Sequence, residues 1–199
     1  AVENLFIFTT LFIIFCIVIG ILLAILLDQK IRAEGFLRTI YLYPMALSFI
    51  VTGTAWRWML NPSLGIEKFA QDLGFVNFTF DWLVTPGMSI YTIVIAGVWQ
   101  SSGFIMAIFL AGLRSVDDEI IKAAKIDGAS LVSVYTKIIL PMMRPVFMSA
   151  IVILVHLAIK SYDLVIALTA GGPGISSDMP AVFMTQMAFH RSEIGLASA

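Results

Sequence analysis

Three ionisable residues interrupt an otherwise apolar stretch near the carboxyl end of the chain. His156, Lys160 and Asp163 follow one another at i, i+4 and i+7, a spacing that places them on one face of a helix. Inside a bilayer such groups cost about 2.5–3.5 kcal/mol each on insertion scales, so they normally face protein or a water-filled cavity. The face therefore predicts the polar lining of a solute pathway, or else an ion pair that holds helices together. Further side chains that suit such a lining are Trp99, Gln100 and Tyr162.

Other kinds of chemistry fit these residues less well. His156 has no second histidine or carboxylate at ligand spacing within one turn, so no metal site is expected. No cluster of His, Asp and Glu and no nucleophile motif predicts a catalytic site, which argues against a membrane enzyme. A proton relay through His156, Lys160 and Asp163 would suit an ion-coupled secondary carrier, and this alternative stays open.

A second group of residues predicts a compact turn between two short helices within 114–145. Ser115 and Asp118 have the spacing of a capping box, which predicts a helix over about 116–126. Gly128 then breaks the helix, and Asp127 is positioned to cap a second helix over about 129–139. Small side chains around the turn would allow a partner surface to approach closely, although an ordinary surface loop would also fit; they are Ala123, Ala124 and Ala129.

The elements that must position these residues are long and apolar. Hydrophobic residues make up 60% of the 199 positions and charged residues only 13%, about half the usual share of a soluble domain. Residues 5–27 carry no charge and would extend roughly 35 Å as a helix, enough to cross a bilayer core of about 30 Å. Similar runs predict four membrane helices in all, over about 5–27, 40–60, 90–113 and 146–168. The lone cysteine, Cys16, is expected to be a small apolar side chain within the first of them.

The connections between these runs predict an orientation. Basic residues gather in two of them: Lys30, Arg32 and Arg38 within 28–39, and Arg114, Lys122, Lys125, Lys137 and Arg144 within 114–145. The connection 61–87 instead holds Lys68 beside Glu67, Asp72 and Asp81. The positive-inside rule then places 28–39 and 114–145 in the cytoplasm, and 61–87 and 169–199 outside. The final residues read as the start of another apolar helix, so we expect a fragment that is incomplete at both ends.

Several spaced motifs resemble the permease subunits of ABC importers. The stretch from Glu119 to Ala129, followed by Ile139-Leu-Pro141, resembles their "EAA" loop: Glu-Ala-Ala, three residues, Gly, nine residues, then Ile-x-Leu-Pro. The family's Glu position holds Lys122, a reversal of charge. Residues that match the loop pattern are Ala123, Ala124, Asp127, Gly128, Ala129, Ile138, Leu140 and Pro141. Segments 97–104 and 110–114 resemble the helix that precedes this loop in the family. Segments 160–163 and 168–173 resemble the end of the following helix in the carbohydrate-importer branch.

This resemblance implies a fold, partners and a mechanism. The fold would be an all-α polytopic membrane protein of the importer-permease (MetI-like) type, with about four of an expected six helices present. Residues 114–145 would form a cytoplasmic coupling loop that sits in a cleft of an ATPase. The sequence holds no Gly-x4-Gly-Lys-Ser/Thr phosphate loop, so ATP–Mg would be bound by the partner and no cofactor by this chain.

The implied assembly lies in the inner, or plasma, membrane of a bacterium or archaeon. Its other members would be a second permease subunit, identical or similar, two cytoplasmic ATPase subunits, and a periplasmic or lipid-anchored substrate-binding protein. No nucleic acid is expected as a partner. The solute would be a sugar, and the run from Lys160 to Pro173 looks closest to glucose- or mannose-type permeases.

Overall fold

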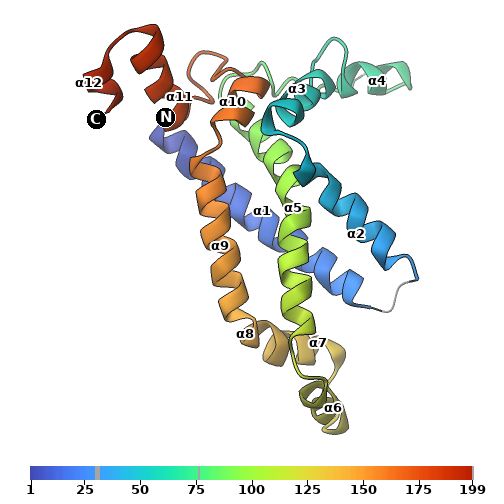
Figure 1. Ribbon diagram of the computed structural model, residues 1–199. Coiled ribbons are helices and arrows are strands. Elements are labelled where there is room, and N and C mark those ends of the chain that lie inside the picture. The colour runs from blue at the N-terminus through green and yellow to red at the C-terminus, as the bar shows by residue number, and fades with distance from the viewer. Residues whose placement is uncertain (30–31, 76, 199) are drawn as a thin grey trace.

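The computed structural model describes residues 1–29, 32–75 and 77–198, and within these ranges the regular elements are helices, without a strand (Figure 1). Lys30, one of the basic residues predicted to face the cytoplasm, lies outside the described residues. The all-α class expected from the sequence is confirmed. Its α-helices are α1 (Val2–Asp28), α2 (Glu34–Leu42), α3 (Phe49–Met59), α4 (Ile66–Asp72), α5 (Ser89–Arg114), α6 (Asp118–Ile126), α7 (Leu131–Val134), α8 (Leu140–Met142), α9 (Arg144–Ile159), α10 (Tyr162–Leu168), α11 (Pro180–Thr185) and α12 (Ile194–Ala197). A 3₁₀-helix, η1 (Tyr43–Ala46), and two π-helices, η2 (Tyr135–Ile139) and η3 (Gln186–His190), complete the regular structure.

Two of the described helices, α1 and α5, are long and apolar enough to cross a membrane unaided. Two bent pairs raise the number to 4 if each pair forms one span: Glu34–Ala46 with Phe49–Met59, bent by 99°, and Leu131–Met142 with Arg144–Ile159, bent by 65°. The segment 40–60 is therefore not one straight helix. Pro44 lies in η1, and the Ser48 hydroxyl accepts a hydrogen bond from Val51 N at 3.3 Å, so a new helix starts there.

The segment 146–168 is also divided. The helix α9 ends at Ile159 and α10 begins at Tyr162, with no glycine or proline between them. The helix α10 then packs against α3, and a methyl group on Gly53 would lie 2.6 Å from the Ala167 Cβ. The break therefore turns the chain out of the α9 direction and onto α3.

The long elements run between two ends of the molecule (Figure 1). The end of α1, the start of α2 and the helices α6–α8 lie at one end. The helices α3, α4, α10, α11 and α12 lie at the other end, together with both termini. In the middle, α1 crosses behind α5 and α9 and packs against both, while α2 packs against α5.

A close contact between α1 and α5 forms the centre of the core. The buried side of α1 repeats every four residues over most of its length: Phe8, Phe12, Cys16, Gly20, Ala24, then Leu27. A methyl group on Gly20 would lie 2.7 Å from Ile105 Cγ2 and 3.1 Å from Met106 N, so glycine permits the close approach. Cys16 is fully buried against the neighbouring helix, as expected for a small apolar side chain.

The helix α5 also holds the bend between α2 and α3. A Cβ at Gly103 would clash with the carbonyl oxygen of Tyr41, so the two backbones touch at this point. One turn earlier, Gln100 Nε2 donates to the carbonyl oxygen of Leu47 at 2.8 Å. Leu47 lies outside regular helix at the bend, where a carbonyl buried away from water needs a partner. The two contacts fix the bend against α5.

We expect Gly103→Ala to destabilise the fold, because the added methyl group meets backbone that cannot rotate aside. Overpacking of this kind costs about 1–3 kcal/mol. The matched control is Gly35→Ala in α2, where nothing lies within 4 Å of the added Cβ. Heating of the detergent-solubilised protein, followed by size-exclusion chromatography, should show a lower melting temperature for Gly103→Ala alone. Equal melting temperatures for the two variants would contradict the close contact with Tyr41.

Candidate functional site

The predicted coupling loop forms a helix–turn–helix projection at one end of the molecule. Gly128 lies in the turn between α6 and α7 with φ of +78°, a left-handed conformation that favours glycine. Predicted helix 116–126 is observed as Asp118–Ile126, whereas predicted helix 129–139 is divided into α7 and η2. The turn was found from sequence because its signal, a glycine between two amphipathic stretches, is local.

The capping residues of these helices differ from the prediction. Asp117, not Ser115, caps α6, with its carboxylate accepting from Glu119 N at 2.9 Å. The Ser115 hydroxyl instead donates to Gly112 O at 2.7 Å and closes the last turn of α5. Ser130, not Asp127, caps α7, because Asp127 still belongs to the end of α6. The side chain of Asp118 lies outside the described residues, so its part in the predicted capping box does too.

The projection exposes an apolar surface together with charged side chains. Ala124 is buried in the core and Ala129 is half-buried. The side chains of Lys122, Ala123, Asp127 and Pro141 are exposed, as is Gly128, and Leu140 is half-buried. Large apolar side chains are also exposed here, with Ile126 at 86% and Val132 at 71%. Such a patch on a short helical projection is typical of a protein-binding surface.

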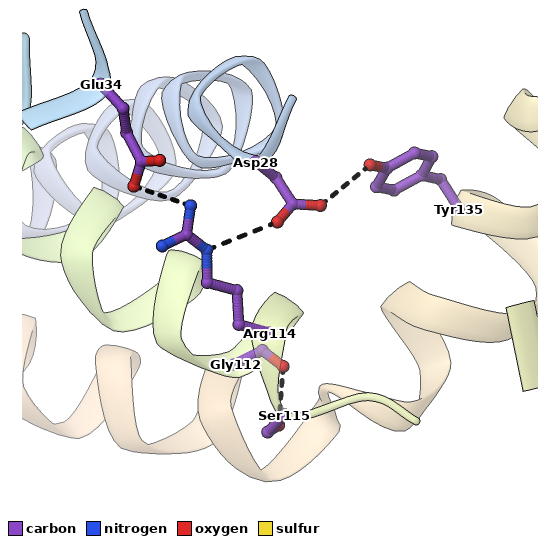
Figure 2. Close-up of polar contacts among 6 residues, drawn as sticks. All are labelled: Asp28, Glu34, Gly112, Arg114, Ser115 and Tyr135. Carbon is purple, nitrogen blue, oxygen red and sulfur yellow. Dashed lines mark hydrogen bonds and ion pairs between the residues drawn. The ribbon is translucent and has the colours of Figure 1, made fainter. Parts of the chain in front are cut away.

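A polar cluster joins this projection to the helix ends. Figure 2 shows the Arg114 guanidinium, at the end of α5, between the carboxylates of Glu34 and Asp28. Arg114 Nη2 lies 2.7 Å from Glu34 Oε1, and Arg114 Nε lies 3.7 Å from Asp28 Oδ1. From the projection, the Tyr135 hydroxyl donates to Asp28 Oδ2 at 3.4 Å. Burial, the negative charge of Asp28 and this hydrogen bond raise the pKa of Tyr135, so its hydroxyl keeps its proton. No sequence signal pointed to this cluster, because its members are far apart in the chain.

The predicted polar face near the end of the chain is not a single helical face. His156 lies on α9, Lys160 in the break after it, and Asp163 on α10. All three side chains are exposed, and Tyr162 is half-buried. No ion pair between Lys160 and Asp163 occurs among the ion pairs of the described residues. The break between α9 and α10 removes the regular spacing from which the shared face was predicted.

The other two predicted pathway residues have different environments. Trp99 is 42% exposed and packs edge-on against Trp56, with ring centroids 5.9 Å apart. Both rings line a cavity of about 650 Å³, together with Tyr41. Gln100 is buried and its amide nitrogen is bound to Leu47, so it holds the bend instead of lining the cavity.

The cavity includes aromatic residues that sequence reasoning did not assign to a pathway. Trp56 and Tyr41 are among these residues. The four residues His156, Lys160, Tyr162 and Asp163 do not line it. Over the described residues, no group of three or more His, Cys, Asp or Glu side chains is arranged to hold a metal ion.

Comparison with known proteins gives one family. Residues 16–197 match the family described as "Binding-protein-dependent transport system inner membrane component". A probable ABC transporter permease protein of Pyrococcus horikoshii is 39% identical over all of this chain and 68% of its own length. The xylose/arabinose import permease protein of Haloferax volcanii is 39% identical, with coverage of 96% of this chain and 59% of the relative. The trehalose/maltose transport system permease protein of Thermococcus litoralis is 34% identical over 79% of this chain and 53% of its own length.

A solved structure shares the fold. It is a bacterial ABC transporter involved in the import of the acidic polysaccharide alginate, with a TM-score of 0.86 over 99% of this chain and 70% of that chain. Sequence identity to it is 20%, so the likeness concerns the fold. The chain thus spans between 53% and 70% of the length of these proteins.

We expect Gly128→Val to loosen the turn between α6 and α7, because a β-branched residue is strained at positive φ by about 1–2 kcal/mol. Gly128→Asn is the matched control, since asparagine adopts this conformation more readily and nothing lies within 4 Å of the added Cβ. Hydrogen–deuterium exchange of 118–134 should rise in the valine variant and change little in the asparagine variant. Equal exchange in the two variants would show that the turn does not depend on its backbone conformation.

Proposed function

The chain belongs to the family of inner membrane components of binding-protein-dependent transport systems, and from this premise we propose that it is a permease subunit of an ATP-driven sugar importer. Membership makes it a transport component of a membrane, not an enzyme. The observation that carries the proposal is the projection formed by α6, the Gly128 turn and α7, with its exposed apolar side chains. A separate ATPase would act on this projection.

The positions of the charged residues support an orientation in the membrane. Lys122 and Lys125 are exposed on α6, at the end of the molecule where α6–α8 lie (Figure 1). The acidic residues Glu67 and Asp72 lie on α4 at the opposite end (Figure 1). We therefore propose that 114–145 faces the cytoplasm, and that 61–87 and 169–199 face the outside. Four passages through the membrane, over about 5–27, 40–60, 90–113 and 146–168, would connect the two sides, in the inner membrane of a bacterium or archaeon.

The proposed docking surface for the ATPase is centred on Ile126, Leu131 and Val132. These side chains are 60–86% exposed in the single chain, and burying them against a cleft would be favourable. Lys122 and Lys125 flank them and would select acidic groups on the partner. Two ATPase subunits, a second permease subunit and an extracytoplasmic binding protein would complete the assembly.

A sugar is the proposed solute because of both the relatives and the cavity. Two relatives are named for xylose/arabinose and for trehalose/maltose. The cavity carries the indole rings of Trp56 and Trp99 and the phenol of Tyr41, and flat aromatic faces suit the apolar faces of sugar rings. The exposed side chains of His156, Lys160 and Asp163 and the half-buried Tyr162 would supply hydrogen bonds along the pathway outside this cavity. The likeness to glucose- or mannose-type permeases stays a prediction.

The orientation is tested by cysteine labelling, for which the buried Cys16 gives a low background. Leu64→Cys and Ile126→Cys place thiols at opposite ends, at positions that are 83% and 86% exposed. A membrane-impermeant maleimide should label Leu64→Cys in intact cells, and Ile126→Cys only after permeabilisation. Labelling of Ile126→Cys in intact cells would place the projection outside, where no cytoplasmic ATPase can reach it.

The partnership is tested by Val132→Asp, which puts a charge in the centre of the proposed docking surface. Loss of one well-buried apolar contact, about 1.5–3 kcal/mol, should weaken co-purification of the ATPase by about tenfold or more. Leu64→Asp at the opposite end is the control and should leave it unchanged. Unchanged ATPase binding by Val132→Asp would argue against the docking surface. Solute uptake by the subunit without any ATPase would favour the ion-coupled carrier instead.

A further inference from the structure

Asp28 joins the projection to the membrane helices through two separate contacts. Its Oδ2 accepts the hydrogen bond of Tyr135 at 3.4 Å, and its Oδ1 lies 3.7 Å from Arg114 Nε. Tyr135 belongs to η2, Arg114 ends α5, and Asp28 ends α1. Among the hydrogen bonds of the described residues, that of Tyr135 is the one that links a side chain of 118–142 to the helices α1, α2 and α5. A displacement of η2 therefore reaches Asp28 directly.

The distances make Asp28 the loosely held member of the cluster. Arg114 binds Glu34 tightly, at 2.7 Å, whereas both contacts of Asp28 are longer than 3.3 Å. Two carboxylates share one guanidinium, so one negative charge is left over, and the Tyr135 hydroxyl is the donor that faces it (Figure 2). If the hydroxyl moves away, the leftover charge is best satisfied by a closer approach of Asp28 to Arg114. A closer contact between Asp28 and Arg114 is therefore the alternative arrangement that the charges of this cluster favour once the hydroxyl has left.

The helix that carries Tyr135 is suited to such a movement. Tyr135 is the first residue of the π-turn, and its carbonyl accepts from Leu140 N, five residues on. A π-turn holds one residue more than an α-turn, and it often marks a functional site. Conversion to α-helical hydrogen bonding would rotate Tyr135 by roughly 100° relative to the residues after the turn. Two apolar side chains anchor the segment: Val134, just before the π-turn, and Ile139, its last residue, are both buried.

We propose that Asp28 is a positioning residue that passes the displacement of 118–142 to the ends of α1 and α5, by exchanging the Tyr135 hydroxyl for a closer contact with Arg114. The proposal rests on the proposed function, in which an ATPase displaces 118–142. When the ATPase draws η2 away, Tyr135 leaves Asp28. Asp28 and Arg114 then close, and the ends of α1 and α5 approach each other. In the reverse step, Tyr135 returns and separates them.

The test uses the assembled complex of this subunit with its ATPase partners, and AMP-PNP–Mg²⁺ as the probe. Hydrogen–deuterium exchange is followed in 118–142 and in the ends of α1 and α5, with and without the nucleotide. In the wild type, both regions should respond. In Tyr135→Phe, which keeps the ring and removes the hydroxyl, 118–142 should respond as before, while the response at the ends of α1 and α5 falls about threefold.

Two further variants separate this role from a merely structural one. Asp28→Asn should give the same loss as Tyr135→Phe, and the double variant no further loss, because both remove one link. Thr136→Val removes a neighbouring hydroxyl that bonds only to Val132 O in its own segment, and it should leave both responses intact. A structural role would change exchange without nucleotide and leave the nucleotide response unaltered.

The outcomes distinguish the two proposals. If Tyr135→Phe and Asp28→Asn both transmit the nucleotide response to α1 and α5 as the wild type does, the role of Asp28 is refuted while the importer function stands. If 118–142 in the wild type does not respond to the nucleotide at all, the proposed function fails and the role of Asp28 fails with it.

Discussion

The close approach of α1 to α5 at Gly20 is the contact on which the rest of the structure depends. In lipid, no hydrophobic force draws helices together, so van der Waals packing between small residues must hold them. The buried stripe of α1, with Cys16, Gly20 and Ala24 at its centre, meets α5 along much of its length. Because α5 extends from one end of the molecule to the other, it places α2 and α3 on its flank and the projection at its end.

The second constraint is that a bend inside a membrane exposes backbone groups that lipid cannot satisfy. At the bend after η1, Gln100 supplies a donor to Leu47 O, and Ser48 accepts from the first turn of α3. The Gln100 amide of α5 therefore stabilises the bend and does not line the cavity. This explains why Gln100, which looks like a pathway residue in sequence, is buried, while the neighbouring Trp99 opens onto the aromatic cavity.

Sequence reasoning succeeded where the signal was local. The uncharged runs 5–27 and 90–113 are observed as Val2–Asp28 and Ser89–Arg114, and Gly128 does lie in a left-handed turn. It failed where the cause was a distant partner. The largely apolar run 146–168 predicted one helix, although the chain breaks before Tyr162 to place α10 against α3. Likewise, the hydrogen bond from Tyr135 to Asp28 spans 107 positions of the chain, and no spacing rule reaches that far.

The proposed function requires that the projection be attached to the membrane helices through few contacts. A segment that is pushed by a partner must move without unfolding the helices behind it, so a broad apolar interface to the bundle would be a disadvantage. The helix α6 packs on α7 and exposes Ile126, whereas the buried side chains among the described residues of 118–142 are Ala124, Val134 and Ile139. Apolar contacts of this kind resist separation but have little preference for direction. A hydrogen bond does depend on direction. The hydrogen bond from Tyr135 to Asp28 is therefore better suited to transmit the direction of the projection's movement to α1.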